Sequence, residues 1–174
     1  MTTQSRGKIG AGITPHPFHM EEKEYGSKYK DHLVEQYKKY IDGVEILITR
    51  RQKTNDFFLT INTAMFTLIG FSSKLAESYF VFVAAVISCL GAFISIMWYR
   101  LMRSYRDIGE NKYRVLHKME EKLPASLYSF EWDLLGRGED EKKYTPIMHV
   151  EMKIPVVFTV FYAVLFVVVF IWWL

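Results

Sequence analysis

The sequence predicts an all-α membrane protein with three transmembrane helices and a small cytoplasmic helical region. Residues 57–71 and 79–98 form two apolar spans joined by a short polar turn, and residues 154–174 form a third. A helix needs about 20 residues to cross about 30 Å of hydrocarbon, and each span approaches that length. The third span is the strongest argument against a soluble protein whose apolar helices are buried in a core.

Basic residues border the first two spans and predict their orientation. Three precede the first span and three follow the second: Arg50, Arg51, Lys53, Arg100, Arg103 and Arg106. The turn between the spans has Lys74 and Glu77 as its charged residues. Because cytoplasmic segments carry the excess of Lys and Arg, both outer ends of this hairpin are expected in the cytoplasm. The N-terminus would then be cytoplasmic and the C-terminus outside.

The composition argues against several classes of protein. The chain has 174 residues, of which 50% are hydrophobic, and a net charge of +3 in which both signs are mixed. Nucleic-acid binding needs basic residues clustered on one face, whereas here they lie at the membrane borders. The single cysteine, Cys89, excludes an intrachain disulfide and a cysteine-based metal site. We expect no signal peptide, no cofactor, no nucleic-acid partner and no enzymatic activity, because no motif for any of them is present.

Residues 1–26 are expected to form a flexible N-terminal tail. Its glycines resemble part of a phosphate-binding loop, but no strand precedes them and no helix follows. His16 and His19 could form half of a metal site, but no second pair of ligands has a matching spacing. We therefore expect no metal site.

Residues 27–55 predict a cytoplasmic amphipathic helix. Its apolar positions recur at steps of four and three residues: Leu33, Tyr37, Tyr40, Val44 and Leu47. Such a stripe needs an apolar partner. Three partners fit the pattern, namely the membrane surface, the second cytoplasmic helix, or the same helix of a neighbouring subunit.

Within the transmembrane hairpin, residues 56–99, the first span carries a polar face. Its members follow a four-three-four-three spacing: Asp56, Thr60, Thr63, Thr67 and Gly70. Asn62 lies nearby, off this line. Hydrocarbon offers such groups no hydrogen-bond partner. Two interpretations follow: the groups bond within the protein, at about 0.6 kcal/mol each, or a ring of these helices lines a hydrated path.

The second span carries a face of small residues. They are three and four positions apart: Ala84, Ser88, Gly91, Ala92 and Ser95. Small residues let helix backbones approach closely. We expect this face to pack on the first span or across a subunit boundary.

Residues 100–153 predict a cytoplasmic helical segment that continues the second span. Trp98 should mark the inner membrane interface. We expect a kink or a short break at Gly109 and the end of the helix at Leu123-Pro124, because the residue before proline avoids the helical conformation.

A short helix should follow, capped by Ser126 or Ser129. Tyr105 and Trp132 are the expected residues of a small cytoplasmic core. The third span, residues 154–174, is apolar all round, as is typical of a helix at the lipid-facing rim.

The block after the second span carries a set of motifs: Tyr99-Arg100, Arg103-Ser104-Tyr105-Arg106, Asn111-Lys112-Tyr113, Leu123-Pro124, Tyr128, Glu131-Trp132 and Leu135-Gly136. This set resembles the pattern of the RipA-like family of small bacterial membrane proteins, which are described as octameric. The resemblance extends over residues 28–155. It implies a homo-oligomeric ring, an octamer, in the bacterial inner membrane, and it brings no catalytic residue.

Two hypotheses for function follow. In the first, the ring forms a pore or gated path with the threonines inside and the third span outside, and Arg100, Arg103 and Arg106 form a cytoplasmic ring that biases against cations. In the second, the assembly is a non-conducting scaffold that organises lipids or displays its cytoplasmic helices to a protein partner. A membrane effector of stress or phage defence is a further alternative, but it needs a ligand site that the sequence does not show. The expected partners are other copies of the chain and membrane lipids.

Overall fold

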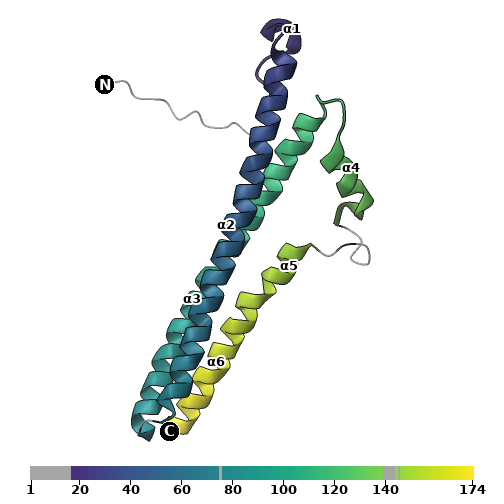
Figure 1. Ribbon diagram of the computed structural model, residues 1–174. Coiled ribbons are helices and arrows are strands. Elements are labelled where there is room, and N and C mark those ends of the chain that lie inside the picture. Colours follow the sequence, from purple (N-terminus) through teal and green to yellow (C-terminus); the bar gives the residue numbers. More distant parts are fainter. Residues whose placement is uncertain (1–16, 75, 139–143, 145) are drawn as a thin grey trace, which may run out of the picture.

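The computed structural model describes residues 17–74, 76–138, 144 and 146–174, and this part of the chain is helical without a strand. Two long antiparallel helices, α2 (Tyr29–Ser72) and α3 (Glu77–Glu120), lie side by side (Figure 1). Each has 44 residues, which corresponds to about 66 Å at about 1.5 Å per residue. That is about twice the thickness of a membrane's hydrocarbon core. One half of each helix must therefore lie outside the membrane.

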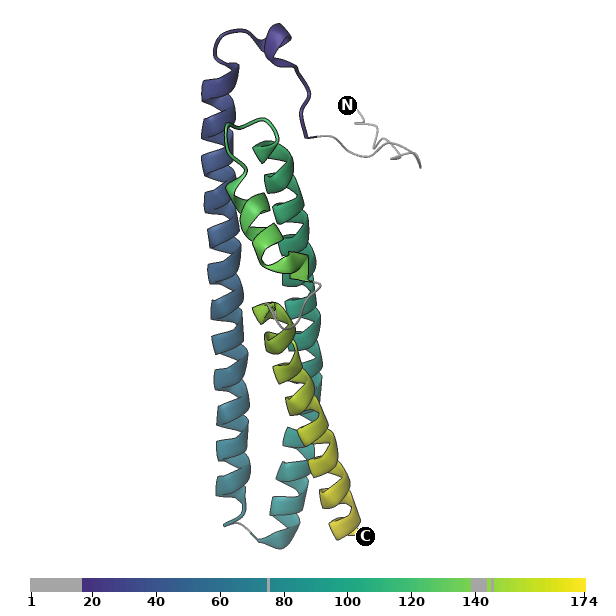
Figure 2. The same ribbon diagram turned by 90° about the vertical axis from the view of Figure 1, so that its right-hand side faces the viewer.

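The shorter elements pack along this pair. They are α1 (Glu22–Tyr25), α4 (Leu127–Leu134), the 3-10 turn η1 (Gly136–Gly138), α5 (Ile147–Glu151) and α6 (Lys153–Trp173). The elements α4, α5 and α6 all lie on one side of the α2–α3 pair (Figures 1 and 2). Of the expected N-terminal tail, residues 1–16, including His16, lie outside the described part.

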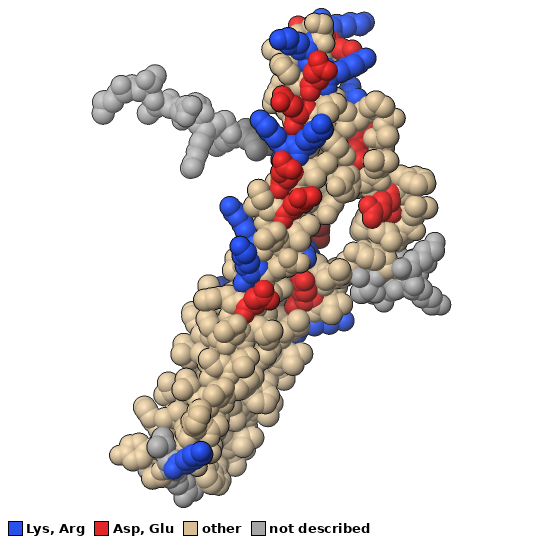
Figure 3. Space-filling model, viewed as in Figure 1, with Lys and Arg blue, Asp and Glu red and all other residues tan. Residues whose placement is uncertain are grey.

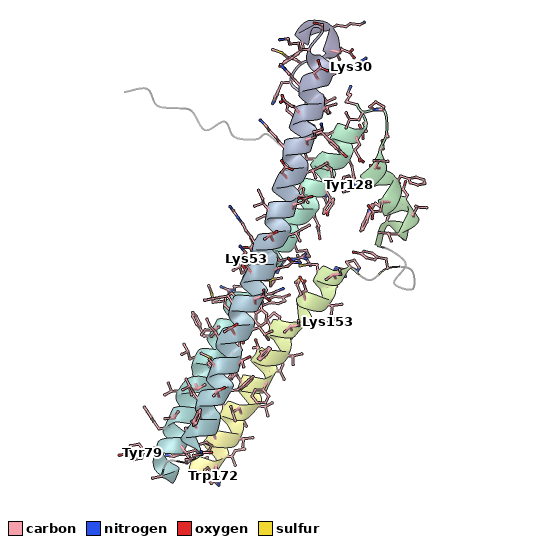
Figure 4. The ribbon with its side chains drawn as sticks, in the orientation of Figure 1. Lys30, Lys53, Tyr79, Tyr128, Lys153 and Trp172 are labelled. Carbon is pink, nitrogen blue, oxygen red and sulfur yellow. The ribbon has the colours of Figure 1, made fainter. Side chains whose placement is uncertain are left out.

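Charge separates the two halves of the bundle. On the face seen in Figure 3, most charged side chains lie on the half that holds α1 and α4, whereas the described surface of the other half is almost entirely uncharged, with a basic side chain at its tip. Tyr79 and Trp172 lie at that apolar end, and Lys53 and Lys153 lie near the middle (Figure 4). Within the described residues, two helical stretches are long and apolar enough to cross a membrane, Tyr79–Glu120 and Ile147–Trp173. The expected first span, residues 57–71, forms the last turns of α2 beside them.

Both long helices are continuous where the sequence suggested a boundary. The expected break at Gly109 is wrong, because α3 runs through it without interruption. A Cβ at Gly109 would lie 3.9 Å from Leu47 Cδ2, which is an ordinary van der Waals distance, so the packing against α2 leaves room for a methyl group here. The helix ends at Glu120, three residues before Leu123, and the Glu120 side chain accepts hydrogen bonds from the first turn of α4.

In the apolar half, an aromatic ring of α6 sits in a notch on α3. Tyr162 is fully buried, and a Cβ added at Gly91 would lie only 2.4 Å from its ring. The Tyr162 hydroxyl donates to Met65 Sδ on α2 at 3.7 Å, so one side chain contacts all three helices. The buried Tyr162 side chain therefore fixes the position of α6, although the exposed surface of this helix is largely apolar.

A second cluster lies where the apolar half meets the charged half. Trp98 is 1% exposed, stacks on Phe58 with ring centroids 5.6 Å apart, and donates from Nε1 to Asn55 Oδ1 at 2.9 Å. Trp98 was expected at the lipid interface, but the ring points into the bundle. Its N–H finds a partner on α2 there, so burial of the indole leaves no donor unpaired.

In the charged half of the bundle, the first half of α2 packs on the second half of α3. Leu33 and Val44 are buried, as are Leu116 and Met119 on α3. The Lys112 ammonium lies 4.7 Å from the centre of the Tyr40 ring. Of the three partners that fit the apolar stripe, the second half of α3 in the same chain is the one that covers these buried positions.

The Gly91 notch gives a first prediction. In Gly91→Ala the new methyl group collides with the Tyr162 ring, and overpacking of this kind typically costs about 1–3 kcal/mol. We expect a lower midpoint of thermal unfolding in detergent. Gly70→Ala is the matched control, because nothing lies within 4 Å of a Cβ there, and it should stay within about 1 kcal/mol of wild type. Equal midpoints for the two variants would contradict the packing described.

Candidate functional site

The threonine face of α2, defined as Thr60, Thr63 and Thr67, is exposed along its whole length. Each hydroxyl donates to the backbone carbonyl four residues earlier, at 2.7 Å from Thr60, 2.9 Å from Thr63 and 3.0 Å from Thr67. The hydroxyl protons are therefore satisfied within the helix, while the oxygen lone pairs point outward. Such a surface accepts hydrogen bonds from water and costs little against lipid.

Asn62 does not belong to this face. It is completely buried, and its side-chain amide donates to the Phe58 carbonyl at 2.8 Å. The Ser95 hydroxyl on α3 approaches Asn62 Oδ1 at 3.5 Å. At about 100° per residue, the threonine face lies roughly opposite to Asn62 and Met65 on α2. The polar residues of the first span thus divide into an internal group and an outward group.

The outward faces of the other two apolar helices carry no comparable row. On α3 the exposed side chains are mostly large and apolar, such as Phe82, Val86, Phe93 and Ile96. On α6 the exposed side chains include Val157, Val160, Val164 and Val168. In the apolar half of the described bundle, repeated polar side chains therefore reach the surface along α2.

The same side of α2 stays polar beyond the apolar half. At the three- and four-residue spacing of the threonines, the exposed positions toward the N-terminus are Asp56, Gln52, Thr49, Glu45, Asp42 and Lys38. Helical periodicity places these residues in line with the threonine face. The result is a continuous polar stripe over most of the helix.

The two neighbouring helices, α2 and α6, pack on the face of α3 that carries the five small residues of the second span. Ala84, Ser88 and Ser95 are fully buried and Ala92 is half-buried. Ser95 faces α2 through Asn62, while Gly91 lies under Tyr162 of α6. The Ser88 hydroxyl donates to the Ala84 carbonyl at 2.7 Å, so it needs no partner on another helix.

The three arginines that follow the second span do not share one environment. Arg100 and Arg103 are exposed on the side of α3 that faces away from its packing face. Arg106 is half-buried and pairs with Asp107 at 3.1 Å and with Glu110 at 3.5 Å. Its own helix therefore neutralises Arg106, and Arg100 and Arg103 remain as exposed cations.

A buried ion pair joins α2 to α5. Arg51 Nε lies 3.2 Å from Glu151 Oε2, and the two side chains are 17% and 19% exposed. Sequence reasoning counted Arg51 only as a topology signal. Its partner is 100 residues away along the chain, so no spacing rule could have identified it.

The Glu120 carboxylate is the best-connected polar group outside the apolar half. The residue is fully buried, and Oε1 accepts from the Tyr37 hydroxyl and from the Tyr128 amide, each at 2.9 Å. Oε2 accepts from the Ser129 amide at 2.9 Å and from the Ser129 hydroxyl at 3.0 Å. The carboxylate thus caps the first turn of α4, where unpaired amides and the helix dipole favour a negative charge.

Two opposing effects set the pKa of Glu120. Burial raises the pKa of this carboxyl, but the hydrogen bonds from Tyr128, Ser129 and Tyr37 outweigh burial, so the pKa lies below its ordinary value. Burial, together with the hydrogen bond to Glu120, also raises the pKa of Tyr37, so its hydroxyl stays a donor. Glu120 therefore carries its charge at neutral pH.

Sequence reasoning missed this cap and named Ser126 or Ser129 instead. Ser126 makes no side-chain cap, and Ser129 binds Glu120. The sequence feature that could have indicated this cap is Glu120 itself, an acidic residue that shares a helix side with the apolar positions Leu116 and Met119.

Tyr105 and Trp132, the two residues expected in a core of the segment 100–153, differ in how far they are buried. Tyr105 is half-buried and packs against Trp98, Met102 and Met152. Trp132 is 36% exposed and lies against Tyr144 with ring centroids 6.4 Å apart, so it does not anchor a core. The Glu120 cap holds α4 to α3 in place of apolar burial.

Two hollows are present in the described bundle. A polar one of about 260 Å³ lies between α3 and α4 and is bordered by His117, Ser129 and Trp132. An apolar groove of about 740 Å³ lies between α3 and α6 beside Trp172 and Trp173. No group of three or more His, Cys, Asp or Glu in the described residues is arranged to hold a metal ion.

Comparison with known proteins places these features in a family. The family model for octameric membrane proteins (8xMP) matches residues 34–171. This match confirms the resemblance to an octameric membrane family, over most of the chain. No curated protein and no solved structure matches the chain.

Removal of the Glu120 cap is the second prediction. In Glu120→Ala, the half-buried amides of Tyr128 and Ser129 lose their acceptor, and a hydrogen bond to a charged group contributes about 1.5–3 kcal/mol. We expect α4 to detach, measured as faster hydrogen exchange at these two amides. Glu121→Ala is the matched control, because its side chain is 57% exposed and pairs only with Lys118. Unchanged exchange in Glu120→Ala would refute the capping role.

The lowered pKa of Glu120 gives the third prediction. The group contributes stability that is present above the ordinary carboxyl pKa of 4.5 and is lost as the pH falls below it through the folded value. Docking of α4 should therefore weaken on acidification below about pH 4.5 and not on alkalinisation. Trp132 fluorescence, read in a variant lacking the other tryptophans, would report it. In Glu120→Gln this acid transition should be absent.

Proposed function

The chain belongs to the octameric membrane protein family, and from this premise we propose that eight copies form a ring around a water-filled path lined by the threonine face of α2. The observation that supports it most is the placement of polar groups. In the apolar half of the bundle, the threonine face is exposed on the side of α2 opposite to Met65, while α3 and α6 present apolar side chains outward. Lipid tolerates such a hydroxyl face at little cost, but the free lone pairs gain hydrogen bonds when the face meets water instead.

The proposal takes α2 as a third transmembrane helix. Residues 57–71 are shorter and more polar than the two stretches that qualify by hydropathy alone. Yet Met65 contacts Tyr162 and Asn62 contacts Ser95, so these turns lie at the level of both apolar helices. With the basic residues inside, the N-terminal half of α2 is cytoplasmic and the turn after Ser72 lies outside, in the bacterial inner membrane.

The polar stripe of α2 supports a path rather than simple helix packing. Threonines alone are tolerated against lipid. The stripe continues through Asp56 and Gln52 into Glu45 and Asp42, which are exposed and charged. A surface that stays polar from the membrane into the cytoplasm is what a continuous water column requires. We propose no catalytic role, because the site contains no nucleophile, base or metal ligands in mutual contact.

The exposed arginines Arg100 and Arg103 do not line the proposed path. Arg100 and Arg103 lie on the outward side of α3, away from α2, so a basic ring at the mouth of the path is not favoured. We propose that they contact anionic lipid headgroups at the inner membrane surface, where each basic residue contributes about 1 kcal/mol.

The fourth prediction concerns ion flux through protein reconstituted in liposomes. Thr63→Leu and Thr67→Leu replace hydroxyl-bearing side chains by larger apolar ones, which creates a hydrophobic constriction in the proposed path. An added barrier of only about 1.4 kcal/mol lowers flux about tenfold. We expect a loss of at least that size, measured with a fluorescent dye that reports salt entry.

Two controls make this test specific. Thr63→Ser keeps the hydroxyl and should retain flux, and Cys89→Leu alters an exposed position on α3 and should have no effect. Native mass confirms that each variant keeps eight copies. Wild-type octamers without measurable flux would instead favour the scaffold, and equal flux in Thr63→Leu and wild type would remove α2 from the path.

A further inference from the structure

The outward face of α4 is apolar although it lies far from the apolar end of the bundle. Leu127, Phe130 and Leu134 are 68%, 64% and 65% exposed. They recur at steps of three and four, so they share one side of the helix. The opposite side of α4 is held to Glu120 through Tyr128 and Ser129, next to the end of α3 (Figure 2). The face lies in the charged half of the bundle, away from the apolar helix surfaces that suit acyl chains, so we take its surroundings to be water or protein.

A second pair of exposed apolar side chains lies on α3. Leu101 is 40% exposed and Ile108 is 44% exposed. They are seven residues apart, so they lie on the same side of α3, two turns from each other. Described elements cover neither of them.

The two patches lie on opposite sides of the subunit. α4 contacts α3 through Tyr113 and Glu120. At about 100° per residue, Ile108 is roughly 140° away from Tyr113 around α3. In agreement, α4, α5 and α6 lie together on one side of the α2–α3 pair (Figure 1). Each copy therefore carries one uncovered apolar face to either side.

We propose that these two faces bind each other between neighbouring copies of the chain, with Leu127, Phe130 and Leu134 of one subunit against Leu101 and Ile108 of the next. A ring with more than two members requires such a heterologous contact, in which two different surfaces meet at every boundary. The family supplies the second copy, since it is described as octameric. The contact requires the oligomer and is independent of whether the ring conducts.

Cysteine cross-linking tests the contact directly. Two single-cysteine chains, Phe130→Cys and Ile108→Cys, are made in a Cys89→Ser background and co-expressed in membranes. Oxidation should join them into a dimer of one chain of each kind, and the double variant should form a ladder that reaches eight copies. Phe130→Cys with Arg114→Cys is the matched control, because Arg114 is exposed on a different side of α3, and it should give no ladder.

Charge substitution supplies the second measurement. Phe130→Asp should reduce the native mass in nanodiscs from eight copies to one or two, whereas Glu131→Gln on the same helix should leave it at eight. Circular dichroism checks that both variants keep their helices. An octamer that survives Phe130→Asp, or a lack of cross-linking in an intact octamer, would overturn the proposal. Loss of bound lipid in Phe130→Asp at unchanged native mass would also overturn it and assign the face to the membrane surface.

Discussion

The uninterrupted packing of α2 against α3 decides where the other side chains of this protein point. Both helices are about twice as long as the hydrocarbon core is thick, and each keeps the same side toward its partner from the Leu33 end to the Ser72 end. A rotation of α2 about its axis in the apolar half would therefore also pull Val44 out of contact in the charged half. This coupling holds the threonine face away from the bundle.

Three pairs of polar side chains inside the bundle form hydrogen bonds between α2 and α3 and fix how the two helices are aligned. Asn62 with Ser95 lies in the apolar half, Asn55 with Trp98 lies at the junction, and Tyr37 with Glu120 lies in the charged half. A shift by one residue would separate all three pairs at once. Because an unpaired buried polar group is costly, such pairs define the register more sharply than apolar contacts do.

The subunit presents different surfaces along two directions that are perpendicular to its long axis. One direction runs from the threonine face of α2 through α3 to the exposed apolar side chains beyond it. The other runs from the side that carries α4 and α6 to the side that carries Leu101 and Ile108. In a ring, the first direction corresponds to the radius and the second to the circumference. The proposed path and the proposed contact between copies therefore make no competing demand on one surface.

The sequence by itself determined the helical class, which is confirmed, and the octameric membrane family, which the family model confirms over residues 34–171. Apolar length and helical periodicity are local properties, so they can be read without knowing any contact. The tertiary structure decided which polar residues turn inward, which partner covers the cytoplasmic stripe, and what caps α4. Asn62 and Thr63 are adjacent in sequence, yet one is buried and the other is exposed. The Arg51–Glu151 pair and the Glu120 cap depend on groups that are far apart along the chain or on different helices. No local pattern encodes such pairings, because they exist only once the helices have packed.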